Sequence, residues 1–391
     1  MEQGKARRSA KARQSTTALL HLWLGLSVGL LLTICGLTGS YLTFHQQIER
    51  SALAELRLSP GVQPASYEAV YRTLTHVAPS APGDWNIELP VGGGIITSRL
   101  PGKDGPRMVS IDPATLRVVR DVQWGETIST WLYELHYHLL MGRTGASVMG
   151  VAGIAIMVLL ALGGVLWWRS GRSMRSRLSF RASGTGQRKL YDAHRLIGLA
   201  SLLLLFISVL TAVAMSLPKH VRPMLAAVSP ISRLSDTSSG SARGRPRMGI
   251  DRALAIARTA VPDGEVRWIR VPAKSEGAYI VRFWQPGEPS RRFPKSSVSI
   301  DQYDGRVLAI YRAPRGSISD GILLWLYPLH GGEAFGVAGR VIVALLGLVP
   351  AILFVTGLLR WRSKVARLAA ATRKQAKVLN TDARPATIRN Q

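Results

Sequence analysis

Four long apolar stretches divide the chain, and polar segments separate them. They are residues 17–44, 146–168, 196–217 and 337–361. Each reaches the roughly 20 residues that a helix needs to cross a bilayer, and none carries the polar stripe of a helix in a globular core. The first is longer than the apolar region of a signal peptide, which holds about 7–15 residues. We therefore interpret it as a retained span, and the pattern predicts a membrane protein with four spans.

The two long segments that follow the first and third spans have a different periodicity, typical of small α+β domains. Each begins with a helical pattern, at 66–77 and at 250–260. Short alternating runs follow, separated by turn signals that contain Gly and Pro. The runs that predict strands are 85–89, 107–111, 266–271, 279–283 and 297–300. We therefore expect two modules in which one helix packs on an antiparallel sheet.

The chain also repeats itself. The run WLYELH at 131–136 recurs as WLYPLH at 325–330, and His21 at the head of the first span matches His194 at the head of the third. Both copies have the same orientation, which indicates a parallel repeat about an axis along the membrane normal. The predicted fold is a membrane α-helical protein, with a four-helix transmembrane bundle from a tandem parallel repeat and two periplasmic α+β modules.

Charge orients these spans. The formal net charge of +27 by itself suggests a polyanion such as nucleic acid. However, residues 1–20, 169–195 and 360–391 hold +4, +7 and +8, so +19 of the excess lies on one side of a four-span topology. Lys and Arg beside spans mark the cytoplasmic side. We predict contact with a lipid bilayer, no nucleic-acid partner, and both termini in the cytoplasm.

Histidines are the candidate redox ligands. The single cysteine, Cys35, excludes a disulfide framework, a four-cysteine zinc site and an iron–sulfur cluster held by one chain. His21 and His194 lie near the inner ends of their spans, whereas His136 and His330 precede the second and fourth spans on the outer side. Histidines on two facing helices can hold a b-type haem by its axial positions. Zinc fits less well because a catalytic zinc takes three protein ligands.

These motifs, taken in order, resemble the PepSY-associated transmembrane family, the iron-regulated inner-membrane proteins of Gram-negative bacteria, and are similar to the FoxB-type ferric-siderophore reductases. The resemblance covers about residues 15–365. The motifs that carry it are HLWLG at 21–25, LHYHLLMG at 135–142, DAHRLIG at 192–198, PLHGGEAFG at 328–336, and the span endings GVLWWR at 164–169 and TGLLRWR at 356–362.

The resemblance implies an inner-membrane reductase with two b-type haems and PepSY-like outer modules. It would pass electrons across the membrane to an Fe(III)–siderophore in the periplasm and release Fe(II). His21, His194, His136 and His330 are the histidines of the family motifs and would be the axial ligands of the haem iron. No catalytic acid, base or nucleophile is required, and the sequence shows no such constellation.

The ligands of the outer haem stay open at this point. His138 has no counterpart in the second half, where Gly332 stands, and His45 and His220 lie at the outer ends of the first and third spans. The candidates are His136, His138, His45, His220 and His330.

Other functions fit the same sequence. It has no nucleotide-binding glycine motif, so electrons would come from an external donor, either a membrane quinol or a cytosolic reductase docked on the basic inner face. A non-enzymatic PepSY envelope protein, acting in peptidase inhibition or sensing, and a component of siderophore or iron uptake are the alternatives. The second outer segment has a net charge of +9, which suits either anionic chelates or anionic lipid headgroups.

The expected segments are 1–16 (basic cytoplasmic N-terminus), 17–44 (first span), 45–130 (first module), 131–168 (outer helix and second span), 169–193 (basic cytoplasmic loop), 194–217 (third span), 218–324 (second module), 325–361 (outer segment and fourth span) and 362–391 (basic cytoplasmic tail).

Overall fold

Within the part of the chain that the computed structural model describes, four helices are long and apolar enough to cross a membrane. They are α2 (Thr16–Ala52), α5 (Gly142–Trp168), α7 (Gly186–Ser216) and α11 (Gly336–Asp382). The four predicted spans are confirmed as helices, and each helix extends beyond its apolar stretch because polar residues continue it. The structure describes residues 16–53, 62–79, 84–103, 105–171, 173–232, 237–240, 242 and 244–382. Residues 1–15 of the predicted N-terminal segment 1–16 lie outside the described residues. The same holds for the part of the predicted tail that follows residue 382.

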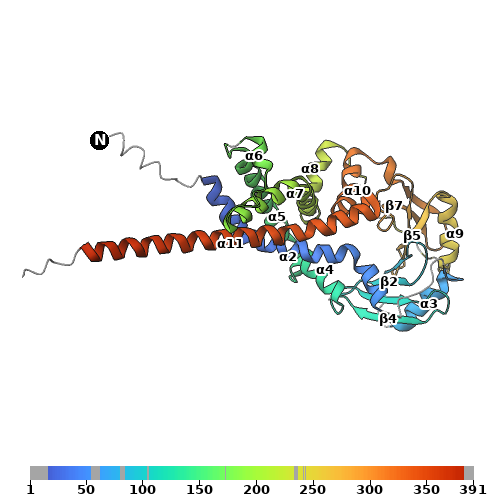
Figure 1. Ribbon diagram of the computed structural model, residues 1–391. Coiled ribbons are helices and arrows are strands. Elements are labelled where there is room, and N and C mark those ends of the chain that lie inside the picture. The colour runs from blue at the N-terminus through green and yellow to red at the C-terminus, as the bar shows by residue number, and fades with distance from the viewer. Residues whose placement is uncertain are drawn as a thin grey trace, which may run out of the picture. The chain divides into compact units, whose positions relative to one another are not determined.

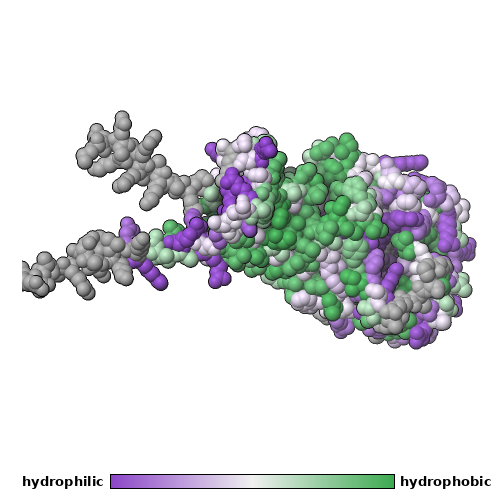
Figure 2. All heavy atoms as spheres, viewed as in Figure 1, coloured by the Kyte–Doolittle hydropathy of each residue, from purple (hydrophilic) through white to green (hydrophobic). Residues whose placement is uncertain are grey.

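The chain divides into two compact units. The helical unit comprises Met1–Leu37, Ala152–Phe206 and Leu346–Gln391, and the sheet unit comprises Thr38–Val151 and Ile207–Leu345. Hydrophobic residues gather over the long helices, as Figure 2 shows. In the most apolar window of each span only 11–28% of the residues are buried, so most of these side chains are available to lipid.

Small residues bring two spans of the helical unit close together. A Cβ added at Gly36 in α2 would overlap the carbonyl oxygen of Gly347 in α11, and it would lie 3.3 Å from Cγ of Pro350. Glycine therefore permits the two backbones to approach, as it does in many membrane helix pairs. Pro350 lies inside α11, where it leaves one carbonyl of the preceding turn without its usual backbone donor.

The described residues of the sheet unit (Figure 1) form one antiparallel sheet. It has eight strands in the order β4-β3-β2-β1-β5-β6-β7-β8. Its strands are β1 (Trp85–Glu88), β2 (Ile96–Leu100), β3 (Arg107–Ile111), β4 (Val118–Gln123), β5 (Glu265–Val271), β6 (Ala278–Trp284), β7 (Ser296–Asp301) and β8 (Val307–Tyr311). The five predicted strands are present, and β2, β4 and β8 are additional.

The prediction of two separate outer modules needs a correction. Each predicted module supplies four consecutive strands, but β1 and β5 pair along their edges, with Trp85 opposite Val271 and Glu88 opposite Trp268. An unpaired edge exposes backbone donors and acceptors that favour association. Pairing satisfies one edge of each half, so the two halves form a single sheet.

Two helices cover one face of this sheet. They are α3 (Tyr67–Val77) and α9 (Ile250–Ala260), as predicted apart from one residue at the start of α3. Their apolar sides, including Leu74 and Leu254, pack in one core with alternate strand residues such as Ile87 and Val281. Alternation along each strand thus directs every second side chain into this core and leaves the others on the opposite face.

The remaining elements are α4 (Ile128–His138), α6 (Met174–Leu178), α8 (Pro218–Val228), η2 (Ala313–Arg315), α10 (Ile318–His330) and η3 (Glu333–Phe335).

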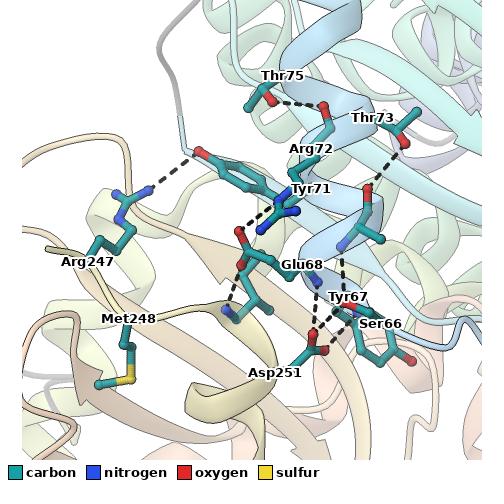
Figure 3. A network of polar contacts seen from close by, with 12 residues as sticks. Ser66, Tyr67, Glu68, Tyr71, Arg72, Thr73, Thr75, Arg247, Met248 and Asp251 are labelled. Carbon is teal, nitrogen blue, oxygen red and sulfur yellow. Dashed lines mark hydrogen bonds and ion pairs between the residues drawn. The ribbon is translucent and has the colours of Figure 1, made fainter.

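The first turns of α3 and α9 cap each other (Figure 3). The Asp251 carboxylate, at the start of α9, accepts hydrogen bonds from Ser66 Oγ at 2.6 Å and from the backbone N–H of Tyr67 at 2.8 Å. In return, the Glu68 carboxylate of α3 accepts from the backbone N–H of Ile250 at 2.9 Å. Each helix therefore places an acid at the positive end of the other, which satisfies donors that the helix itself leaves unpaired.

We expect Asp251→Asn to lower the free energy of unfolding of the sheet unit by about 1 kcal/mol. Both carboxylate oxygens accept hydrogen bonds, so an amide NH2 must face a donor on α3. Thermal unfolding of the full chain in detergent would measure the loss. Asp263→Asn, at an exposed acid of a turn, is the matched control. Equal melting temperatures for both variants would contradict this role for Asp251.

Candidate functional site

Two predicted histidines meet in the helical unit. His21 of α2 and His194 of α7 have ring centres 6.4 Å apart, with their planes at 88°. His21 Nδ1 donates to the carbonyl oxygen of Leu159 in α5 at 3.2 Å, and His194 Nδ1 lies 2.9 Å from Oγ1 of Thr356 in α11. All four spans therefore contribute to this pair.

These contacts define the tautomer of both rings. A carbonyl oxygen only accepts, so His21 carries its hydrogen on Nδ1. The Thr356 hydroxyl donates to the carbonyl oxygen of Ile352 at 2.7 Å, so it accepts from His194 Nδ1. In a neutral imidazole with hydrogen on Nδ1, the lone pair is on Nε2. Metal-binding histidines commonly have this arrangement, in which the second nitrogen donates to an outer partner.

Glycines allow both rings to lie against helix backbones. A Cβ added at Gly163 in α5 would lie 3.2 Å from Cε1 of His21, and one at Gly357 in α11 would lie 3.6 Å from Cε1 of His194. Gly357 lies in the TGLLRWR motif, but its contact with His194 was not predicted from the sequence. Its signal is an offset of 194 residues, which relates it to Gly163 and also relates His330 to His136.

A second pair meets in the sheet unit. His136 of α4 and His330 of α10 have ring centres 6.1 Å apart, with their planes at 52°. His330 Nδ1 donates to the carbonyl oxygen of Ser208 in α7 at 3.0 Å. His136 Nδ1 lies 3.0 Å from Oγ1 of Thr38, and Thr211 Oγ1 lies 3.4 Å from His330 Nδ1. Thr38 and Thr211 are 173 residues apart, the same offset as between the two histidines of the first pair.

Burial also favours the neutral form of His330. It lowers the pKa of His330, although the hydrogen bond to Ser208 opposes this shift. A neutral imidazole retains the lone pair that metal binding requires. Gly39 in α2 supports the partner ring, because a Cβ there would lie 3.0 Å from Cε1 of His136.

The other candidate histidines have different surroundings. His138 Nδ1 lies 2.7 Å from the Glu134 carboxylate, whose other oxygen accepts from Trp124 Nε1 at 2.6 Å. Two positions along a helix differ by about 200° in direction, so His136 and His138 face different sides of α4. His45 Nδ1 donates to a carbonyl of its own helix at 2.6 Å, and His220 is exposed. The structure therefore pairs His136 with His330, and none of these three histidines takes that place.

The separations fit two imidazoles bound to opposite sides of one metal ion. A metal–nitrogen bond of about 2.0–2.1 Å and about 1.1 Å from ring nitrogen to ring centre give about 6.3 Å between centres. The observed values are 6.4 Å and 6.1 Å. Among the described residues, no group of three or more His, Cys, Asp or Glu side chains could hold a metal ion. A pair of neutral imidazoles at this separation would be able to hold the iron of a haem, whose porphyrin would supply the other ligands.

The chain matches the model of a known protein family. Residues 18–364 match the model of a family described as the PepSY-associated TM region. This range includes both histidine pairs and the entire sheet. A comparison with curated proteins gives no match.

Proposed function

We propose that this chain, which belongs to the PepSY-associated transmembrane family, is a di-haem reductase of the bacterial inner membrane that delivers electrons to an Fe(III)–siderophore in the periplasm. Four apolar helices make it a multi-pass membrane protein. The distribution of basic residues supports an orientation with both termini in the cytoplasm and the sheet unit in the periplasm.

The observation that carries the proposal is the presence of two histidine pairs with the spacing of axial ligands. His21 and His194 would hold one haem b, and His136 and His330 would hold the other. Haem supplies one-electron cycling between Fe(III) and Fe(II). The protein's own contribution is to fix each imidazole through its Nδ1 contact and to surround it with apolar spans.

The repeat supports the assignment of equivalent roles. Offsets of 173 residues relate the first and third spans, and offsets of 194 residues relate the second and fourth with their preceding helices. Each histidine, each threonine near the second pair and each glycine behind the first pair has its counterpart at the expected offset. We therefore propose a tandem parallel repeat whose two copies jointly form both sites.

Iron reduction tests the proposal directly. The haem-loaded full chain would be reduced in lipid nanodiscs without oxygen and mixed with an Fe(III)–siderophore in the presence of a ferrous chelator that reports Fe(II). We expect the absorbance bands of the protein to shift to those of its oxidised form. The number of electrons that the protein loses should equal the number of Fe(II) ions that appear. No oxidation by the Fe(III)–siderophore would contradict the reductase and favour a non-enzymatic envelope role.

Thr356 would tune the first site as a positioning residue. We expect Thr356→Val to raise the midpoint potential of one haem by up to about 40 mV, since a lost hydrogen bond of about 1 kcal/mol makes His194 a weaker donor to Fe(III). A spectroscopic redox titration would measure the shift. Thr33→Val is the matched control, because Thr33 also donates to a carbonyl four residues earlier, that of Gly29. Identical titrations for the two variants would contradict this role.

A further inference from the structure

The sheet unit contains a cavity that the histidine pairs do not use. Its volume is about 420 Å³, and its lining includes Arg99 of β2, Arg270 of β5 and Arg282 of β6, together with Asn86, Trp268 and Phe293. The volume is within the range of pockets that hold small molecules, roughly 300–1,000 Å³.

Strand alternation places these side chains on the face opposite α3 and α9. Ile269 and Val271 point into the core beneath those helices, so the intervening Arg270 points to the other face. The same argument applies to Arg282, which lies between the buried Val281 and Phe283. The arginines are therefore positioned by the core strands of the fold.

The positive charge of this cavity is only partly compensated. Arg99 contacts the Glu88 carboxylate at 3.2 Å, but Arg282 has no hydrogen bond or ion pair within the part of the chain that the structure describes. Among the described residues, the Arg270 guanidinium donates only to the Asn86 side chain, at 3.4 Å. Burial, with a smaller effect of Arg270, lowers the pKa of Arg282. A half-buried guanidinium without a counter-charge is costly, so this arrangement favours an external anion.

Aromatic rings connect the cavity to the helix that carries His330. Trp268 and Phe293, both in the cavity lining, stack with ring centres 5.9 Å apart and planes at 24°. The ring of Phe293 contacts that of Tyr327 in α10, with centres 5.0 Å apart. Tyr327 precedes His330 by three residues, which is nearly one helical turn.

We infer that this cavity binds an anionic iron chelate with catecholate-type oxygen donors. Guanidinium groups recognise paired anionic oxygens through charge-assisted hydrogen bonds. The rings of Trp268 and Phe293 stack on each other, and the guanidinium groups of Arg99 and Arg292 lie over them, so charge and not ring stacking selects the ligand. The inference rests on the proposed reductase function for its choice of an iron chelate. An uncharged trihydroxamate chelate would gain little from Arg270 and Arg282.

The test is a binding measurement that needs no electron transfer. The probe is the Ga(III) complex of a tris-catecholate, a redox-inert trianion, titrated calorimetrically against the full chain in nanodiscs of zwitterionic lipid. We expect Arg270→Gln and Arg282→Gln each to weaken binding about tenfold or more, and Arg282→Lys to retain part of the affinity. The matched control is Arg252→Gln, an exposed arginine of α9, which should bind as the unaltered chain does.

Several results would overturn the inference. The first is that Arg270→Gln and Arg282→Gln bind the gallium probe as tightly as the unaltered chain does. The second is that the unaltered chain binds a neutral Ga(III) trihydroxamate as tightly as the tris-catecholate. The third is that inorganic phosphate, at the concentration of the probe, displaces the probe completely. Failure of the proposed function is distinguishable from these, because it would appear as a chain without haem. Arginine-dependent binding of the gallium probe by such a chain would support the cavity and contradict only the reductase.

Discussion

Replacement of His194 by alanine is expected to leave one haem per chain, against the two haems expected in the unaltered protein. The ring centres of His194 and His21 lie 6.4 Å apart, and under the proposed function each would supply one ligand to a shared haem, so neither alone would retain it. His21→Ala should therefore give the same loss. Haem extraction and protein quantification on the purified full chain would measure the stoichiometry.

The control for this loss is His220→Ala. His220 is exposed and lies in α8, so the variant should keep both haems. Insertion of each variant into the membrane should be unchanged, because the four apolar spans are retained. Two haems in His194→Ala, or a loss in His220→Ala equal to that in His194→Ala, would contradict the assignment of the first pair.

His136→Ala is expected to remove the second haem and to reduce the rate of Fe(III)–siderophore reduction to background. The remaining haem should still be reduced by dithionite, because His21 and His194, its proposed ligands, lie in the helical unit, away from the substitution. The neighbouring variant His138→Ala provides the comparison. It removes a contact with Glu134 but leaves the His136–His330 pair intact, so both haems should remain. Loss of the second haem in His138→Ala alone would reverse the assignment.

The membrane spans and the first histidine pair could be predicted from the sequence for clear physical reasons. Long apolar runs leave no alternative to helices that span a bilayer. Ionisable side chains in such runs are rare and face the interior of a bundle, so matched positions of His21 and His194 in a parallel repeat predict that they approach each other. The structure places the two rings beside each other.

The choice between His136 and His138 could not be made from the sequence. Both lie on one short helix, and the side that faces α10 depends on how α4 packs. The repeat offset of 194 residues favoured His136, but Gly332 at the position equivalent to His138 was equally consistent with a specialised first half. The contact between His138 and Glu134 supplies the missing information, because it engages His138 with its own helix.

The joining of the two halves into a single sheet could not be predicted from the sequence either. Strand pairing between β1 and β5 joins segments about 180 residues apart, and alternation determines which residues face the core but not which strand lies alongside. β4 escaped prediction because its six residues include Arg120 and Asp121, and none of the six is fully buried. Val118 of this edge strand packs against the core, but the charged residues interrupt the apolar alternation that would predict a strand.

The sequence contains a pattern that indicates where the arginines of the cavity lie. Arg270 and Arg282 alternate with strongly apolar residues in two core strands, so both had to occupy the solvent-facing side. The net charge of the second outer segment suggested anion binding in general. Only the register of the strands brings these two arginines and Arg99 to one cavity.

The most direct test of the central claim is a reduced-minus-oxidised absorbance spectrum of the full chain, purified from haem-replete cells, with haem quantified per chain. We expect a Soret band, an α band that sharpens on addition of dithionite, and two haems b per chain. A colourless protein would contradict it. In that case the ring separations of 6.4 Å and 6.1 Å would represent contacts between packed imidazoles and not axial ligand pairs.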